Sequence, residues 1–202
     1  MSARRRVSAL VPALVAALWV RAPAQRPHRS GFWLETGSGP GAVRIACSGC
    51  PSVTTAGGSS GYLRLGGALS DKVFLGVESF GFTNQHFAFA GHEASVVAED
   101  GSLGAVVLWY PWRGGVFLKG GVGLARGTFT VTPDSAPALH ATGTGVGLTL
   151  GLGFDLTLSR RFALTANAAD CITAIGDVVL PGTRVDDVIA TVYQATIGIT
   201  LR

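Results

Sequence analysis

Residues 144–158 alternate between large apolar and small or polar side chains almost without a break. Valine, leucine and phenylalanine occupy the even positions from Val146 to Leu158, whereas glycine, threonine and Asp155 occupy the odd ones. A period of two is typical of a β-strand, and this strand is about twice the usual length in a globular protein. One face is apolar throughout, so the pattern indicates a strand between hydrocarbon and a narrow, packed lumen.

The first 24 residues predict export of the chain. Residues 1–6 contain three arginines, residues 7–20 form an apolar stretch, and Ala22-Pro23-Ala24 provides small residues in an A-x-A arrangement. We expect a signal peptide that directs the chain to the Sec route and is cleaved after Ala24, followed by a short periplasmic tail over residues 25–30. A retained anchor is the alternative, but a membrane-spanning helix needs about 20 apolar residues.

The charge of the mature chain gives no support for a nucleic-acid partner, and we expect none. Removing Arg4, Arg5, Arg6 and Arg21 with the signal peptide lowers the 16 basic side chains to 12, the number of acidic ones. The apparent basicity therefore belongs to export. Charged residues are only 14% of the chain, below the roughly 25% of a typical soluble protein.

Eight strand-like segments follow the tail. Many of the 29 glycines lie within them, where in a small barrel they leave room for large side chains on facing strands. The connections between the segments alternate in length, with three short and four long, as expected for antiparallel strands with short periplasmic turns and long extracellular loops. We expect an all-β, eight-stranded antiparallel transmembrane up-and-down barrel over residues 31–202. Its strands are 31–45, 59–69, 72–83, 102–110, 116–130, 141–158, 161–169 and 188–202.

Placing the apolar face outward assigns six polar side chains to the lumen, at similar depth: Glu35, Arg64, Glu78, Lys119, Asp155 and Gln194. Unpaired buried charges are costly, so Arg64 and Lys119 are expected to pair with the three carboxylates in an ionic layer. An eight-stranded barrel is narrow enough to be filled by side chains, which favours a structural role for the layer. The alternative is a proton or ion path, or a gate.

Cys47-Ser48-Gly49-Cys50 is the most prominent cysteine motif. In an exported protein it indicates a small disulfide between Cys47 and Cys50 in the first long connection, with Cys171 left over. A zinc site is the second interpretation and redox activity the third, but no helical context for a redox pair is visible. We expect no cofactor and no bound metal.

Candidate interaction residues lie in the second long connection and at the strand end beside it. These are Phe82, His86, Phe87, Phe89 and His92. His92-Glu93 with Glu99-Asp100 could attract a metal ion, although a solvated loop is the expected reading. Some eight-stranded outer-membrane barrels modify lipid A with a His/Ser pair in a His-x-Ser arrangement on a strand. No segment of this chain predicted to be a strand contains that arrangement, so we predict no catalytic residues and no enzyme.

The strand segments resemble the small outer-membrane β-barrel domain family, which includes the OmpA barrel, OmpX, OmpW and opacity-type proteins. The resemblance is carried by residues 31–33, 62–67, 75–78, 118–123 and 151–156. It implies an outer-membrane location in a Gram-negative-type envelope, contact with lipid and lipopolysaccharide, assembly by the barrel-assembly machinery, and a monomer. Members often end on an aromatic residue, whereas this sequence ends Leu201-Arg202.

Four functional hypotheses follow. The leading one is a non-enzymatic outer-membrane barrel with a filled lumen, acting in envelope integrity or in loop-mediated interaction. The alternative is OmpW-like passage of small hydrophobic molecules, which the phenylalanines of the second long connection favour. A soluble, lipocalin-like periplasmic binder is the third. A lipid-modifying enzyme, the fourth, lacks its residues.

Overall fold

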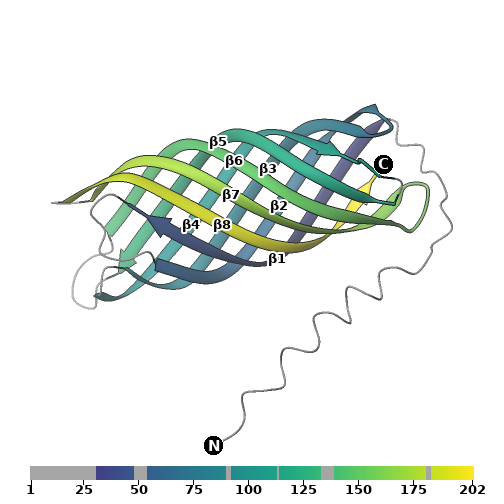
Figure 1. Ribbon diagram of the computed structural model, residues 1–202. Helices are drawn as coiled ribbons and strands as arrows, with labels where there is room; N and C mark the ends of the chain where they lie inside the picture. The colour runs from purple at the N-terminus through teal and green to yellow at the C-terminus, as the bar shows by residue number, and fades with distance from the viewer. Residues whose placement is uncertain (1–30, 48–53, 90–91, 113, 133–138, 181–182) are drawn as a thin grey trace, which may run out of the picture.

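Eight antiparallel strands close into one barrel in chain order (Figure 1). The computed structural model describes residues 31–202 except 48–53, 90–91, 113, 133–138 and 181–182. The strands are β1 Phe32–Ala46, β2 Thr54–Ser70, β3 Val73–Phe89, β4 His92–Trp109, β5 Val116–Thr132, β6 Leu139–Thr157, β7 Phe162–Leu180 and β8 Thr183–Leu201. The predicted all-β, eight-stranded antiparallel barrel is confirmed. The predicted signal peptide and tail, residues 1–30, lie outside the described residues and stay predictions.

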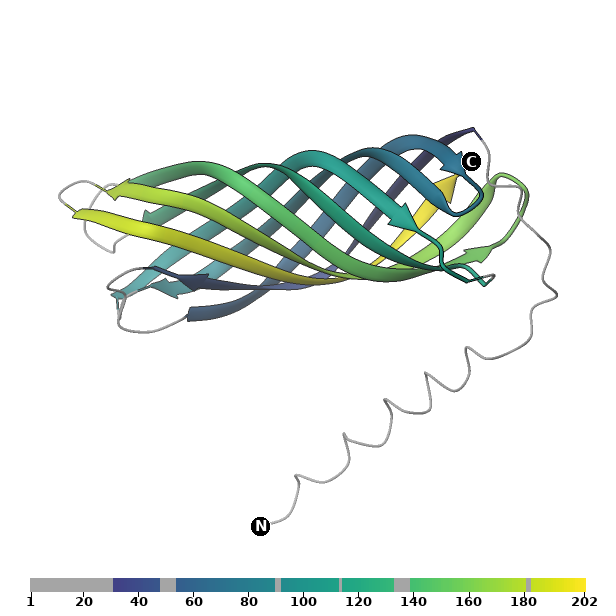
Figure 2. The same cartoon turned by 45° about the horizontal axis from the view of Figure 1, so that its top comes forward.

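Both ends of the barrel chain lie at one end of the cylinder. β1 begins beside the end of β8, since Leu34 pairs with Leu201, and the seam between these strands closes the sheet. We call this the termini end, and the opposite one the far end (Figure 2). The β2–β3, β4–β5 and β6–β7 connections lie at the termini end. Among the described residues, no helix is long and apolar enough to cross a membrane.

The strands run further toward the far end than the sequence predicts. β3 continues to Phe89 and β4 begins at His92, so only residues 90–91 separate two strands that were expected to flank a long loop. Likewise, residues 181–182 alone separate β7 from β8. The expected sorting of connections by length is therefore wrong, although the strand count is right. The cause is visible in β2, where Thr54–Gly58 lack apolar alternation but still pair with β1.

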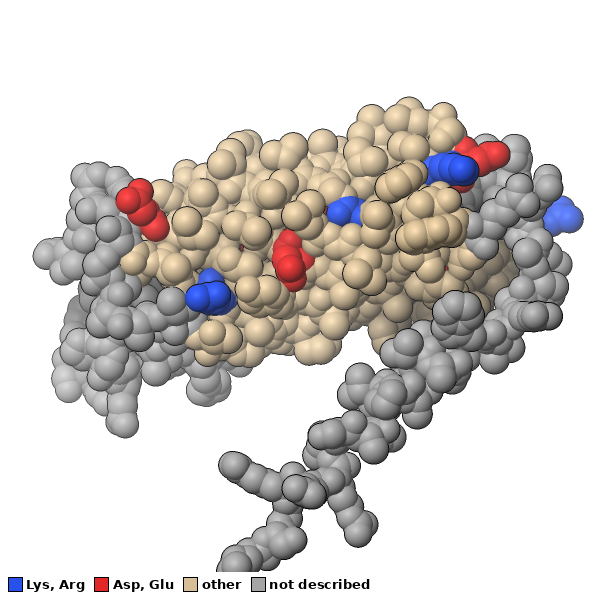
Figure 3. Space-filling model, viewed as in Figure 1, with Lys and Arg blue, Asp and Glu red and all other residues tan. Residues whose placement is uncertain are grey.

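Large apolar side chains cover the outer face of the barrel. Several are more than half exposed, including Leu103, Val122, Leu124 and Ile197. Charged side chains are sparse on the face that Figure 3 shows. The exposed charges Arg44, Arg126 and Asp170 lie at or beyond the middle of their strands, counted from the termini end. An apolar band therefore surrounds the half of the barrel nearer that end.

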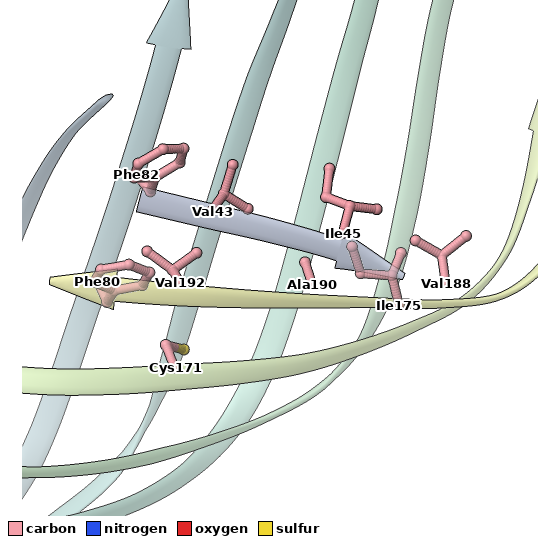
Figure 4. Packing of buried hydrophobic residues seen from close by; sticks show 9 residues of the cluster. All are labelled: Val43, Ile45, Phe80, Phe82, Cys171, Ile175, Val188, Ala190 and Val192. Carbon is pink, nitrogen blue, oxygen red and sulfur yellow. The ribbon is translucent and has the colours of Figure 1, made fainter. Parts of the chain in front are cut away.

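Two apolar clusters fill parts of the lumen. The aromatic cluster lies at the termini end and contains Trp33, Phe74, Val106, Leu108, Tyr110 and Phe117. The far-end cluster contains Val43, Ile45, Phe80, Phe82, Cys171, Ile175, Val188, Ala190 and Val192 (Figure 4). Inward glycines make space for several of the large rings. The ring of Tyr62 lies 2.8 Å from where a Cβ on Gly37 would be, and that of Trp33 lies 3.0 Å from where one on Gly76 would be.

Candidate functional site in the barrel lumen

Four of the six polar residues assigned to the lumen meet in one ionic layer: Glu35 on β1, Arg64 on β2, Glu78 on β3 and Lys119 on β5. The first three stand opposite one another in the register of adjacent strands. Arg64 is fully buried, and its Nη1 donates to Glu35 Oε1 at 2.9 Å. Its Nε donates to Glu78 Oε2. One guanidinium thus joins two carboxylates.

Lys119 completes the layer from the other side of β4. Its Nζ lies 3.1 Å from both carboxylate oxygens of Glu78. β4 carries Gly104 opposite Glu78, so no side chain of that residue stands in the lumen between the two. Two cations therefore face two carboxylates. Such balance is what allows buried charges to persist, because each would be costly without its partner.

Tyr62 supports the layer from the side of the far end. Its hydroxyl donates to Glu35 Oε1 at 2.6 Å. The Arg64 guanidinium carbon also lies 4.0 Å from the centroid of the Tyr62 ring, within the range of a cation–π contact. Nη2 of Arg64 has no hydrogen-bond partner among the described residues. The layer is therefore held by charge and ring contacts from four strands.

Asp155 is buried as expected, but it does not pair with Arg64 or Lys119. It forms an ion pair with Arg202 instead, at the end of β8. Its carboxylate also accepts hydrogen bonds from Tyr110 at 2.8 Å and from Thr165 at 2.9 Å. The expectation of one layer at one depth is wrong, because Arg202 occupies an inward position closer to Asp155 along the tilted strands.

Gln194 is also buried on the inward face. It belongs neither to the ionic layer nor to the second polar cluster, which Asp155 forms with Tyr110, Thr165 and Arg202. Its side-chain oxygen and nitrogen have no hydrogen-bond partner among the described residues. In the register, Gln194 pairs with Gly41 and Ala169, rather than with a member of the ionic layer. Its assignment to the layer is therefore corrected.

The aromatic cluster fills the lumen between the ionic layer and the termini end of the barrel. Its rings form a continuous row: the centroids of Trp33 and Phe74 are 5.8 Å apart, those of Phe74 and Tyr110 5.5 Å, and those of Tyr110 and Phe117 5.4 Å. Such spacings are typical of favourable ring pairs. Tyr110 also bonds to Asp155, which joins this cluster to the second polar cluster.

A cavity of about 1460 Å³ lies on the far-end side of the ionic layer, bordered by β2 to β7. Outward-facing Leu103, Leu124 and Val146 also border it, so this volume is not all lumen. Its inward lining includes Phe80, Phe82, Ile175, Ser60, Ser102 and Asp100. β5 and β6 contribute only Ala125 and Gly145 to this inward lining, so the lumen stays open beside them.

Asp100 is the exception among the buried charges. It is 7% exposed, and neither carboxylate oxygen has a hydrogen-bond partner among the described residues. The Thr173 hydroxyl and the Gly101 backbone lie near its carboxylate without meeting hydrogen-bond geometry. Arg126 borders the same cavity, but its side chain is exposed on the outer face.

The structure places the predicted loop residues in strands. Phe82 lies on β3, within the strand predicted over residues 72–83, but it is buried in the far-end cluster, so its side chain is not displayed for loop-mediated interaction. His86, Phe87 and Phe89 also belong to β3, and His92 begins β4. Asp100 was expected beside them in a solvated loop, but it lies inside the barrel on β4.

The structure describes Cys47 and Cys171 but not Cys50. Cys50 lies outside the described residues, so the Cys47–Cys50 disulfide stays a prediction. Cys171 is a free, buried thiol in the far-end cluster, and Thr149 Oγ1 lies 3.6 Å from its sulfur. Within the described part of the chain, no three His, Cys, Asp or Glu side chains are grouped so as to hold a metal ion.

Sequence reasoning missed four residues of the lumen: Tyr62, Tyr110, Asp100 and Arg202. The period of two contains the signal for all of them. Arg202 has the parity of Gln194, and Asp100 has that of Tyr110 and Leu108 on the same strand. They were missed because Arg202 was treated as a chain end and Asp100 as part of a loop.

The fold is that of the small outer-membrane β-barrels. Ail of Yersinia pestis is 13% identical with a TM-score of 0.56, over 84% of this chain and 97% of that protein. Neisserial surface protein A is 17% identical with a TM-score of 0.53, over 85% and 97%. OprG of Pseudomonas aeruginosa is 16% identical with a TM-score of 0.50, over 87% and 97%.

These identities show a common fold. The expected resemblance to the small outer-membrane barrels is confirmed at that level. No protein-family model matches the sequence, and no curated protein matches it significantly.

Proposed function

We propose that this protein is a non-enzymatic, monomeric barrel of the outer membrane, closed to solutes, which acts in envelope integrity or in interactions at its far end. The observation that carries the proposal is the closed barrel with an apolar outer band and a lumen blocked by the ionic layer. In water, an apolar surface of this extent would favour association.

The dimensions of the band support a membrane-embedded half. A tilted strand crosses the hydrocarbon core with about 9–11 residues. β6 and β8 have 19 residues each, so both extend well past such a span. With the signal peptide cleaved and the termini end in the periplasm, the far end projects outside. Lipid and lipopolysaccharide then contact the band, and the barrel-assembly machinery inserts the chain.

The first test is the location and the folded state of the protein. The full chain, expressed in a Gram-negative host, is expected in the outer-membrane fraction. Unheated samples should migrate differently from boiled samples on a denaturing gel, because a closed barrel resists detergent. Recovery in the soluble periplasmic fraction without detergent would support a lipocalin-like binder and contradict the proposal.

The second test places a charge on the apolar outer band and compares it with a charge outside the band. Val122→Lys places a charge in the apolar band and is expected to destabilise the lipid-embedded protein by about 2–4 kcal/mol. Thr83→Lys, exposed on the same outer face nearer the far end, is expected to cost less. A soluble barrel would tolerate both substitutions within about 0.5 kcal/mol.

Passage of small hydrophobic molecules remains the alternative, and the cavity next to Phe82 favours it. The residues between that cavity and the termini end argue against passage through the whole barrel. A solute would have to displace both the Arg64–Glu78–Lys119 bridge and the row of rings beneath it. The cavity is therefore better suited to binding than to conduction.

A further inference from the structure

Among the described residues, the buried charges of the lumen are paired with opposite charges at every place but one. The ionic layer contains two cations and two carboxylates, and Asp155 has Arg202. Asp100 has no cation beside it among the described residues, and only the Thr173 hydroxyl and the Gly101 backbone lie near its carboxylate, although the residue is only 7% exposed. A carboxylate in such a place is costly unless another group satisfies it.

The surroundings of Asp100 define the missing partner. Asp100 lines the cavity together with two kinds of residue: the apolar Phe80, Phe82 and Ile175, and the serines Ser60 and Ser102. Figure 4 shows the two rings on β3 and Ile175 among the apolar side chains of the far-end cluster. An apolar body would fit against this wall, and a single positive group would satisfy the carboxylate.

A metal ion fits the same place poorly. Hard cations such as Ca²⁺ need six or more oxygen ligands, and several carboxylates usually supply them. In the described part of the chain, Asp100 belongs to no group of three His, Cys, Asp or Glu side chains that could hold a metal ion. A protonated amine needs only one carboxylate and a few hydroxyl acceptors, which is what the cavity offers.

We propose that the far-end half of the lumen binds a small apolar amine, with its ammonium group held by Asp100 and its apolar part against Phe80, Phe82 and Ile175. This amine-binding proposal does not rest on the proposed outer-membrane location, because every residue that lines the site belongs to the barrel itself. The ionic layer forms its floor, so the ligand enters and leaves on the far-end side.

The test compares two probes that differ in charge and hardly in shape. The full barrel, refolded in an uncharged detergent, is titrated near neutral pH with phenethylamine and with phenethyl alcohol, and binding is followed by calorimetry. The amine is expected to bind at least about tenfold more tightly, because hydrogen bonds between charged groups are about twice as strong as neutral ones. Asp100→Asn should remove this preference, whereas Asp71→Asn in the exposed β2–β3 turn should leave it unchanged.

Three outcomes would overturn the proposal. Equal binding of the amine and the alcohol by the unmodified barrel would mean that Asp100 is satisfied as a neutral acid. No binding of either probe would mean that the cavity is not a ligand site. A preference that survives in Asp100→Asn would place the amine elsewhere. Should Asp100→Asn fail to fold, Phe82→Ala is expected to weaken both probes alike, and unchanged affinities would count against the site.

Discussion

Glu78 is the residue on which the ionic layer depends most, because it alone contacts both cations. Arg64 retains Glu35 if Glu78 is neutralised, but Lys119 has no other carboxylate within the described part of the layer. Removing one partner of a buried ion pair costs more than removing both, since the remaining charge stays buried.

Glu78→Gln is therefore expected to lower the free energy of unfolding by about 3–5 kcal/mol. The measurement is a urea titration of the refolded barrel, followed by its mobility on unheated gels. Asp71→Asn removes an exposed carboxylate and should change stability by less than about 0.5 kcal/mol.

Lys119→Met provides a rescue in the same experiment. It removes the unpaired cation but keeps a long apolar side chain, so the double variant with Glu78→Gln should be more stable than Glu78→Gln alone. If Glu78→Gln proves as stable as Asp71→Asn, the layer contributes nothing to holding the barrel together.

At the scale of the strands, inward glycines let neighbouring backbones approach closely. Gly104 on β4 and Gly123 on β5 stand opposite each other, and a Cβ on Gly123 would lie 2.7 Å from the carbonyl carbon of Leu103. Gly120, three residues earlier on β5, faces outward, and a Cβ there would meet no atom within 4 Å. The two positions share a strand and differ in their surroundings.

Gly123→Ala should therefore destabilise the barrel by about 1–3 kcal/mol, as expected when a methyl group is forced into packed backbone. Gly120→Ala should be neutral, or stabilise it by up to about 1 kcal/mol through the entropy of the unfolded chain. The measurement is the urea concentration at the midpoint of unfolding, compared between the two variants. Equal midpoints would show that the β4–β5 contact relaxes without cost.

Strand patterns in the sequence were sufficient for some elements and misleading for others. Residues 144–158 predicted β6 because apolar and small side chains alternate there, and parity alone placed Glu35, Arg64, Glu78 and Lys119 in the lumen. The far-end halves of β3 and β4 were missed, because beyond the apolar band the outer face no longer needs apolar residues. A ladder of backbone hydrogen bonds continues there without an alternating pattern.

The sequence predicts which residues face the lumen better than it predicts which of them contact one another. The period of two says which face a residue is on, but the depth at which two strands meet depends on register and tilt. Asp155 and Arg202 are 47 positions apart in the sequence, and the register of β6, β7 and β8 brings them together. Tyr62 and Tyr110 hydrogen-bond to Glu35 and Asp155 for the same reason.

For the whole molecule, the lumen has three levels along its axis. The aromatic cluster lies at the termini end, the ionic layer comes next, and the cavity with the far-end cluster follows. Eight strands leave an interior just wide enough for side chains to fill, so we expect either of the first two levels to stop ions.

The purified barrel in a planar lipid bilayer is therefore expected to give no stepwise current at neutral pH. Glu78→Gln should be equally silent, because it loosens the ionic layer and leaves the row of rings from Trp33 to Phe117 intact. A porin added to the same bilayer serves as the positive control. Current steps from the unmodified barrel would show that the lumen opens, and would favour the passage hypothesis.

The two polar clusters are divided by chain order as well as by depth. The ionic layer draws only on β1, β2, β3 and β5, whereas Asp155, Thr165 and Arg202 belong to the last three strands. An intermediate that contains the first five strands already holds both cations and both carboxylates of its layer. Assembly can thus proceed from the N-terminus without stranding those charges, and the hydrogen bond from Tyr110 to Asp155 on β6 then joins the two clusters.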